Sequence, residues 1–371
     1  MTYRTNLVSL TALRAPAAFF VFIYHIVHTT NWMRTNSFTS LGYIGVSLFF
    51  VLSGFVLTWS YTPERGYRDF YWRRFARVYP LHILFLCIAL ILPAVSINRD
   101  PIGLIPNIFL VQAWIPQWDI IFAFNGVSWS LSCEFFFYML APIIFTKIAY
   151  QGNEKKAGYL LISWYLLTSV LGSYISSLSN YADVVIYANP LFRSGEFALG
   201  IFLALFVMKM NYSSPSVIRL LVQNRNALGM FLVVILCLTL GIIYLLASYF
   251  SGGQSITSYL LAPVFALIIG AFAISDIVHQ QQPDYRTSKI TKLFAYLGEI
   301  SFAFYLAHEL VIVNLWALPW VQSHGGGGLR GLVLTIIALT LSIIVAMAAH
   351  HVVEKPLQRI ITTWSRGKHS L

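Results

Sequence analysis

Two ionisable residues, Arg14 and His25, stand in the first apolar stretch of the chain with ten residues between them. At about 100° per residue, an α-helix brings both side chains to nearly the same face, about 16 Å apart along its axis. An arginine near the middle of a membrane costs roughly 2.5 to 3.5 kcal/mol on insertion scales, so it requires a buried partner or a wet cavity. The pair therefore predicts a polar, functional face on a membrane helix.

A cluster of arginines, Arg73, Arg74 and Arg77, precedes the third apolar run. On a helix Arg74 and Arg77 share one face, because they are three residues apart. Planar guanidinium groups bind phosphate oxygens well, which favours a phosphate clamp. Arginines at a membrane surface also act as anchors that set topology, and the spacing does not separate these two interpretations.

An acidic residue, Glu134, ends the run Trp129-Ser130-Leu131-Ser132-Cys133-Glu134 and is followed by four aromatic residues. An acid in the first turns of a helix can simply complement the helix dipole. The aromatic residues that follow favour a buried carboxylate instead. Because this span is expected to return from outside to inside, we expect Glu134 at a depth similar to that of His25.

Further polar residues in apolar runs are candidates for the wall of a cavity. Arg193 and Glu196 are three residues apart and could also satisfy each other within one helix. His308 could equally be a buried histidine that is hydrogen-bonded to a neighbouring helix. Ile312 occupies the position of the second histidine in an H-E-x-x-H motif that starts at His308, which excludes that zinc site. Ser53 and Tyr305 complete the candidate wall residues.

The composition identifies the environment of the chain. Of its 371 residues, 58% are hydrophobic and 10% are charged, against roughly 25% charged in a soluble domain. We expect an all-α polytopic membrane protein, with one membrane domain over residues 1–371 and about ten spans around a polar intramembrane cavity. The expected spans are 7–28, 41–60, 78–97, 131–150, 157–177, 189–208, 228–250, 257–279, 295–318 and 329–353, with a re-entrant or interfacial segment at 102–114.

The net charge of +11 indicates topology rather than nucleic-acid binding. With these spans, 19 of the 24 lysines and arginines fall on one face of the membrane. Only Arg34, Arg99 and Arg330 fall on the other. The positive-inside rule therefore predicts that both termini are cytoplasmic. The three cysteines lack metal-ligand spacing, and no metal site is expected.

Several of these motifs, in this order, resemble the membrane-bound acyltransferase-3 family, which includes bacterial enzymes that O-acetylate surface polysaccharides. The residues that carry the resemblance are Arg14 and His25, the stretch from Gly45 to Phe55, Arg74-x-x-Arg77 with Pro80, Trp129-Ser130-Leu131-x-x-Glu134, Ser301 to His308 and Glu354-Lys355-Pro356. The resemblance implies transfer of an acyl group, usually acetyl, from a cytoplasmic acyl-CoA to a hydroxyl of a sugar or another acceptor. It also implies a multi-pass protein of the bacterial cytoplasmic membrane. Some relatives carry an extra extracytoplasmic hydrolase-like domain, for which we expect no room here.

The resemblance and the residues together suggest a division of roles. We expect His25 to take the proton of the acceptor hydroxyl as a general base, and Glu134 to orient and stabilise its imidazole. We expect the donor to be an acyl-CoA, most simply acetyl-CoA, and to bind at Arg14, Arg73, Arg74 and Arg77. No tightly bound cofactor is expected. Two alternatives stay open: a transporter or flippase for a lipid-linked or acylated glycan, and transfer through an acyl-enzyme on Cys133, Ser132 or Ser53.

Overall fold

The computed structural model describes residues 6–30, 39–94, 96–149, 152–210, 225–246, 253–280, 287–324 and 328–367. Over these residues the chain forms helices and no strand, which confirms the expected all-α class. The α-helices are α1 (Val8–Thr30), α2 (Gly45–Ser60), α3 (Gly66–Ile91), α4 (Pro101–Ile108), α5 (Trp118–Ile121), α6 (Trp129–Ile144), α7 (Glu154–Ser176), α8 (Asn180–Ala188), α9 (Pro190–Lys209), α11 (Arg225–Leu246), α12 (Gln254–Gln280), α13 (Lys289–Trp316), α14 (Pro319–His324), α15 (Gly328–Ala348) and α16 (Lys355–Gly367). The 3-10 and π-helical segments are η1 (Thr39–Ile44), η2 (Pro63–Arg65), η3 (Gln112–Trp114), η4 (Gly126–Ser128), η5 (Phe145–Ala149) and η6 (Ala349–Glu354).

Nine helices in the described ranges are long and apolar enough to cross a membrane. They correspond to nine of the ten expected spans. The remaining expected span, 228–250, corresponds to α11, whose apolar part covers Gly229–Ile242. The segment at 102–114 forms the short helix α4 followed by η3, which is too short to cross a bilayer.

The first helix packs closely against α13, because a glycine lies at their contact. A Cβ atom built on Gly298 would lie 1.8 Å from the carbonyl oxygen of Thr11. The start of α1 is also fixed to α12: the carboxylate of Asp276 accepts hydrogen bonds from the backbone N–H and the hydroxyl of Ser9, each at 2.7 Å. These contacts use N–H groups that a helix start leaves unpaired, and they hold Arg14 in place one turn later.

Helices α2 and α9 approach each other at a pair of glycines. A Cβ on Gly54 would lie 2.1 Å from the carbonyl oxygen of Phe197, and one on Gly200 would lie 2.0 Å from that of Val51. Small residues at helix contacts allow such approach in membrane proteins. The glycine-containing stretch of α2 is therefore a packing surface, and it fixes the residues of α2 that line the site below, among them Phe49 and Ser53.

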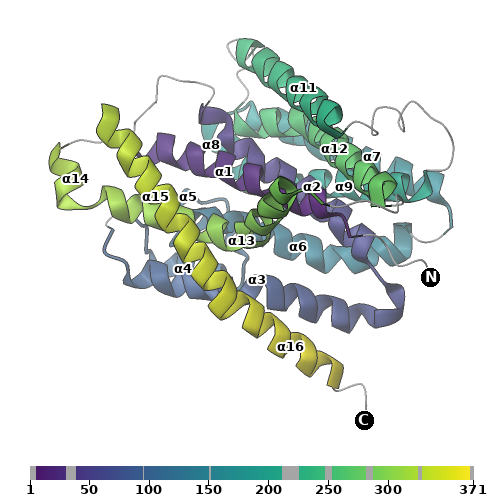
Figure 1. Ribbon diagram of the computed structural model, residues 1–371, viewed down its shortest axis with the longest axis horizontal. Coiled ribbons are helices and arrows are strands. Elements are labelled where there is room, and N and C mark those ends of the chain that lie inside the picture. The colour runs from purple at the N-terminus through teal and green to yellow at the C-terminus, as the bar shows by residue number, and fades with distance from the viewer. Residues whose placement is uncertain are drawn as a thin grey trace.

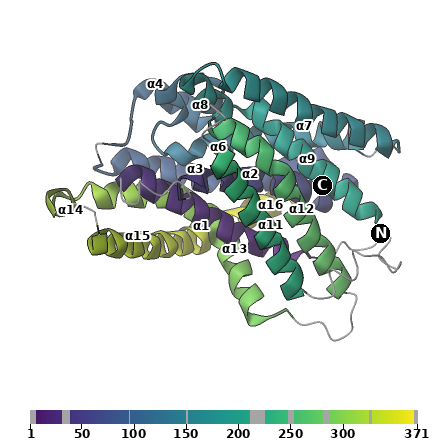
Figure 2. The same ribbon diagram turned by 90° about the horizontal axis from the view of Figure 1, so that it is seen from above.

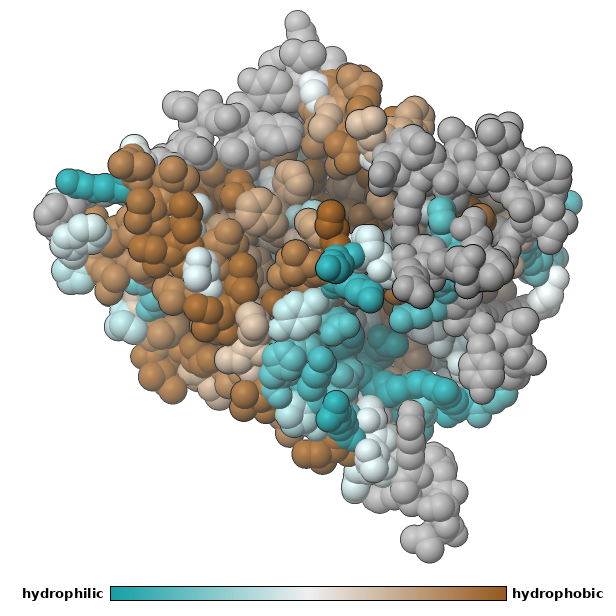
Figure 3. Space-filling model, viewed as in Figure 1, coloured by the Kyte–Doolittle hydropathy of each residue, from teal (hydrophilic) through white to brown (hydrophobic). Residues whose placement is uncertain are grey.

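The long helices α1 and α3 run along the length of the molecule in both views, and α15 crosses in front of them and continues into α16 (Figures 1 and 2). Hydrophobic side chains cover the visible face over α15, where Leu332, Val333, Ile336 and Ile344 are exposed (Figure 3). Hydrophilic side chains gather beside the junction of α15 and α16 (Figure 3). This arrangement fits a lipid-facing wall that ends at a polar mouth.

Candidate active site

A cavity of about 1140 Å³ opens at the end of the bundle where α1 begins, α2 joins α3 and α15 joins α16. We call it the arginine cavity. Its wall combines apolar residues of α1, α2 and α13 with polar residues from seven helical segments. These polar residues include Thr11, Arg14, Ser53, Ser60, Arg74, Arg77, Glu134, Tyr138, Glu299, His350, Glu354 and Lys355. The cavity brings together some of the polar residues of the apolar runs, among them Arg14, Ser53 and Glu134.

Three of the four predicted donor arginines line this cavity, namely Arg14, Arg74 and Arg77. The Arg14 guanidinium lies 5.9 Å from the ring centre of Phe49. That of Arg74 lies 5.7 Å from the ring of Phe70 and 5.9 Å from the ring of Tyr138. The Nε atoms of Arg14 and Arg74 are buried and make no hydrogen bond within the described part of the chain. Buried donors of this kind require acceptors, and an anion supplies them.

The fourth predicted donor arginine, Arg73, lies apart from the arginine cavity. Its Nη2 atom forms an ion pair at 2.7 Å with Asp69, one turn earlier on α3. Arg73 lines a smaller pocket of about 160 Å³, which Arg74 also borders. Of two neighbouring arginines, the structure therefore places Arg74 in the large cavity and Arg73 beside it in an ion pair.

The predicted pairing of Glu134 with His25 is not what the structure shows. Glu134 lines the arginine cavity, and its Oε2 atom accepts a hydrogen bond of 2.6 Å from the hydroxyl of Tyr138. Its charge acts on those of Arg14 and Arg74. Glu134 thus lies beside the arginines, farther than expected from the end of the bundle that holds His25.

His25 instead contacts a second histidine, His308 of α13. Its Nδ1 atom lies 3.2 Å from Nε2 of His308 and 2.9 Å from the carbonyl oxygen of Val21. The Nδ1 atom of His308 lies 3.2 Å from the carbonyl oxygen of Phe304, so it carries the proton in a neutral ring. Nε2 of His308 then accepts, and the proton of His25 sits on Nδ1. This pattern leaves Nε2 of His25 with a free lone pair.

A chain of aromatic contacts connects His25 to the arginine cavity, whose lining includes neither His25 nor His308. Phe49 lines the cavity, and its ring centre lies 6.2 Å from that of Tyr305. The ring of Tyr305 lies 5.7 Å from that of His308, and its hydroxyl donates to the carbonyl oxygen of Val127 at 3.2 Å. Tyr305 and His308, expected in the cavity wall, therefore form the layer behind it, while Ser53 is in the wall as expected.

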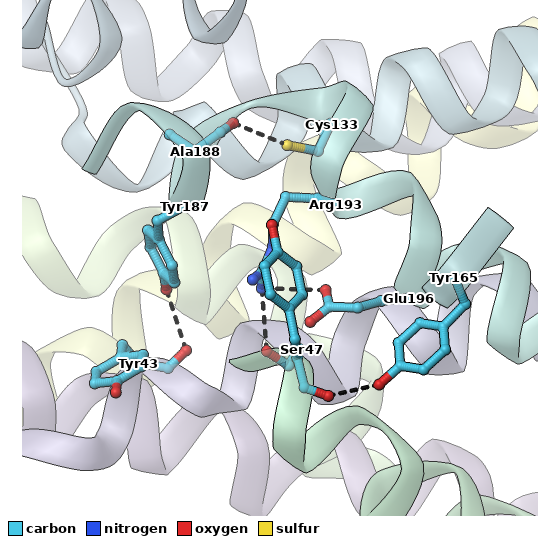
Figure 4. Close-up of polar contacts among 9 residues, drawn as sticks. Tyr43, Ser47, Cys133, Tyr165, Tyr187, Ala188, Arg193 and Glu196 are labelled. Atoms are coloured by element: carbon cyan, nitrogen blue, oxygen red, sulfur yellow. Dashed lines mark hydrogen bonds and ion pairs between the residues drawn. The ribbon is translucent and has the colours of Figure 1, made fainter. Parts of the chain in front are cut away.

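The other two predicted wall residues, Arg193 and Glu196, are fully buried where α9 packs against α2 (Figure 4). Arg193 Nη2 lies 3.2 Å from Glu196 Oε2 and donates to the hydroxyl of Ser47 at 3.1 Å. Its guanidinium also lies 5.0 Å from the ring centre of Phe50 and 4.9 Å from that of Tyr187. Neither residue lines the arginine cavity as expected, because the two charges pair with each other within α9.

The candidate nucleophiles differ in their access to the cavity. Ser53 lines it. Cys133 is fully buried, and its thiol donates to the carbonyl oxygen of Ala188 at 3.3 Å (Figure 4). Ser132 is fully buried too. Among the described residues no group of three His, Cys, Asp or Glu side chains could hold a metal ion.

Sequence reasoning overlooked one polar pair of the arginine cavity. His350 and Glu354 lie in the π-helical segment η6 between α15 and α16, and their side chains meet at 2.6 Å. A histidine and a glutamate four residues apart are a recognisable helix-face pair. The pair lies at the end of the last expected span, 329–353, where the apolar pattern ends.

Comparisons with known proteins agree on the class of activity. The sequence profile of the acyltransferase-3 family, described as an acyltransferase domain, matches residues 7–351. The protein "Acyltransferase MdmB" of Streptomyces mycarofaciens is 30% identical over 386 residues, which cover 96% of this chain and 92% of that protein. "Putative peptidoglycan O-acetyltransferase YrhL" of Bacillus subtilis is 27% identical over 94% of this chain and 54% of its own length.

A third relative, "Putative O-acetyltransferase SACOL0978" of Staphylococcus aureus, is 25% identical over 94% of this chain and 57% of its own length. The chain thus spans little more than half of the Bacillus and Staphylococcus relatives. No solved structure matches this chain significantly.

Proposed function

The chain belongs to the acyltransferase-3 family and is a multi-pass membrane acyltransferase, and from this premise we propose its donor, acceptor and reacting groups. We propose that it transfers an acetyl group from acetyl-CoA to a hydroxyl of a carbohydrate. The observation that carries the proposal is the arginine cavity, where Arg14, Arg74 and Arg77 converge inside a membrane protein. Intramembrane arginines are costly, and a polyanionic ligand gives them a physical reason.

The donor assignment rests on the chemistry of this cavity. The phosphates of acetyl-CoA offer many acceptor oxygens, and arginine forks are suited to bind them in pairs. The buried, unpaired Nε atoms of Arg14 and Arg74 supply donors that nothing else in the described chain satisfies. The apolar wall, which includes Leu10 and Leu52, suits the less polar arm that carries the thioester.

His25 is assigned as the general base because of its hydrogen bonds. Its Nδ1 proton is shared between Val21 and His308, so Nε2 presents the free lone pair that a base needs. His308 takes the orienting role that we had expected of Glu134. Glu134 instead balances charge beside Arg14 and Arg74.

The reaction balances without another reactant. Nε2 of His25 takes the hydroxyl proton while the hydroxyl oxygen attacks the thioester carbonyl. The carbon–sulfur bond then breaks, an ester forms and CoA leaves as a thiolate. The imidazolium of His25 returns the proton, so the product is the CoA thiol. For this step the thioester must pass Phe49, which lies between the arginine cavity and Tyr305.

The acceptor and the location are proposed from two further observations. The Bacillus relative is named as a peptidoglycan O-acetyltransferase, and we take a carbohydrate acceptor from that name. The basic residues concentrate on the side of the chain where the arginine cavity opens, which by the positive-inside rule supports a cytoplasmic mouth. The protein would then be in a bacterial cytoplasmic membrane, with donor and acceptor reaching the reacting groups from opposite sides.

The experiment is acetyl transfer by purified protein in proteoliposomes that contain labelled acetyl-CoA and a muropeptide or oligosaccharide acceptor. We expect label in the carbohydrate as an alkali-labile ester. Movement of the glycan across the bilayer without ester formation would instead identify a transporter. Label on the protein after incubation with donor alone, found by intact mass at Ser53, Ser132 or Cys133, would replace direct transfer with an acyl-enzyme.

A further inference from the structure

The side chains of His350 and Glu354 form a buried pair in the wall of the arginine cavity. Nδ1 of His350 lies 2.6 Å from Oε2 of Glu354, and the two residues are only 5% and 3% exposed. Both come from η6, a single π-helical segment, and such segments are frequent at functional sites. The pair is therefore held in one geometry by the backbone that connects α15 to α16.

The pair has a defined proton arrangement. An ionised carboxylate can only accept a hydrogen bond, so Nδ1 of His350 donates to Glu354. Nε2 of the neutral ring is then an acceptor. This atom is buried and has no hydrogen-bond partner in the described ranges, although it belongs to a residue that lines the cavity. Buried polar atoms are rarely left unpaired, which indicates that a ligand group with an N–H or O–H completes the contact.

The hydrogen-bonding capacity of His350, rather than the net charge around it, separates this position from a phosphate site. Glu354 carries a negative charge within reach of Arg14, and Glu299 lies in the same wall, 3.7 Å from Lys355. Lys355 and Arg14 offset these two carboxylates, but phosphate oxygens only accept hydrogen bonds and so cannot pair with an unprotonated Nε2. Arg74 and Arg77 offer the phosphate contacts elsewhere in the cavity. The unpaired acceptor of His350 instead suits a neutral donor group.

We propose that Nε2 of His350, fixed by Glu354, binds an amide N–H of the pantetheine arm of the donor. This inference rests on the proposed function, because it takes the ligand of the cavity to be an acyl-CoA. The pantetheine arm has amide N–H groups between the phosphates and the sulfur, and the nucleotide phosphates have none. The cavity is thereby divided into a phosphate subsite at Arg74 and Arg77 and a pantetheine subsite at His350. Glu354 is a positioning residue that holds the ring and its tautomer.

The test measures binding to the full-length protein in detergent, with CoA and pantetheine as probes and no acceptor present. His350→Phe removes the hydrogen-bond acceptor. His350→Gln keeps an acceptor at the same place, because Oε1 of glutamine and Nε2 of histidine are the same number of bonds from Cβ. His351→Phe is the matched control: this neighbouring histidine hydrogen-bonds to Tyr296 and is not in the cavity wall. Arg74→Ala identifies the phosphate subsite. Thermal unfolding of each variant checks that the protein is folded.

A neutral hydrogen bond predicts a weakening of about threefold to tenfold in His350→Phe, equal for CoA and for pantetheine. His350→Gln should recover most of it, and His351→Phe should match wild type. Arg74→Ala should weaken CoA and leave pantetheine unchanged.

Equal affinities of His350→Phe and wild type for both probes would overturn the inference, as would a loss confined to CoA. If His350→Phe does not fold, a loss of pantetheine affinity in His350→Gln as large as that expected for His350→Phe would also count against it. Because binding needs no turnover, a wild-type protein that binds both probes but transfers no acetyl group would refute the proposed function alone.

Discussion

Replacement of Arg74 tests the phosphate subsite most sharply, since a matched control lies next to it on α3. The Arg74 guanidinium lies between the rings of Phe70 and Tyr138 at 5.7 and 5.9 Å, and its buried Nε lacks a partner in the described chain. A charge-assisted hydrogen bond contributes about 1.5 to 3 kcal/mol. Arg74→Ala should therefore raise the KM for acetyl-CoA about tenfold to 150-fold. Arg74→Lys keeps the charge and loses the planar fork, so it should fall between wild type and Arg74→Ala.

The assay is initial-rate acetyl transfer in proteoliposomes with acetyl-CoA varied at saturating acceptor. The control is Arg73→Ala, because Arg73 is paired with Asp69 and is outside the arginine cavity. Its KM should stay within about twofold of wild type, because Arg73 does not line the arginine cavity and its charge is already paired with Asp69. The reasoning is refuted if Arg74→Ala leaves the KM unchanged in folded protein, or if Arg73→Ala raises it as much.

Three further predictions concern the layers around the site. His308→Phe should lower kcat with little change in the KM for acetyl-CoA, because it removes the acceptor that orients His25. His308→Gln should restore part of kcat. A change in KM without a change in kcat in steady-state kinetics would contradict this. Gly298→Ala should lower the thermal unfolding temperature, because its Cβ would overlap the Thr11 carbonyl. Gly241→Ala, where the Cβ would enter open space, should not lower it. Equal unfolding temperatures of the two variants would be inconsistent with the α1–α13 contact. Glu196→Leu should destabilise the protein by about 3 to 5 kcal/mol, because it leaves the buried Arg193 without its ion-pair partner. Adding Arg193→Met should recover much of this stability in chemical unfolding. A double variant as unstable as Glu196→Leu would argue against the ion pair.

The helices and their inward polar faces could be predicted from the sequence for clear physical reasons. Apolar runs long enough to cross a bilayer have few structural alternatives, and nine of the expected spans are matched by helices of suitable length. The position of Arg14 in an apolar run, and the shared helix face of Arg74 and Arg77, also indicated what the structure shows, which is a polar cavity. Local pattern was sufficient in these cases because each feature lies within one helix.

Contacts between helices were less predictable, and Glu134 shows why. Its expected depth assumed that α6 begins at the membrane surface. In the structure the residues just before α6 are already buried against α13: Asn125 donates to the carbonyl oxygen of Leu306, and the N–H of Val127 donates to Glu309. The helix therefore starts inside the bundle, so that Glu134 reaches the arginine cavity rather than His25.

The pairing of His25 with His308 could not be found from spacing, because it joins residues 283 positions apart in the sequence. The pattern left two interpretations of His308 open, a cavity residue or a buried histidine bonded to another helix. The structure shows the second, and the partner is the residue expected to act as the base. The pair of His350 and Glu354 was overlooked for a different reason: η6 turns it into the cavity at the point where the apolar pattern ends.

The central claim is that His25 acts on the acceptor hydroxyl while the arginine cavity holds the donor. The most direct measurement compares acetyl transfer and CoA binding in His25→Asn, with His28→Asn, an exposed histidine on the same helix, as control. The account predicts that His25→Asn loses about 10²- to 10⁴-fold in kcat with an unchanged Kd for CoA, while His28→Asn stays near wild type. Normal transfer by folded His25→Asn, or a loss explained entirely by weaker CoA binding, would contradict the account.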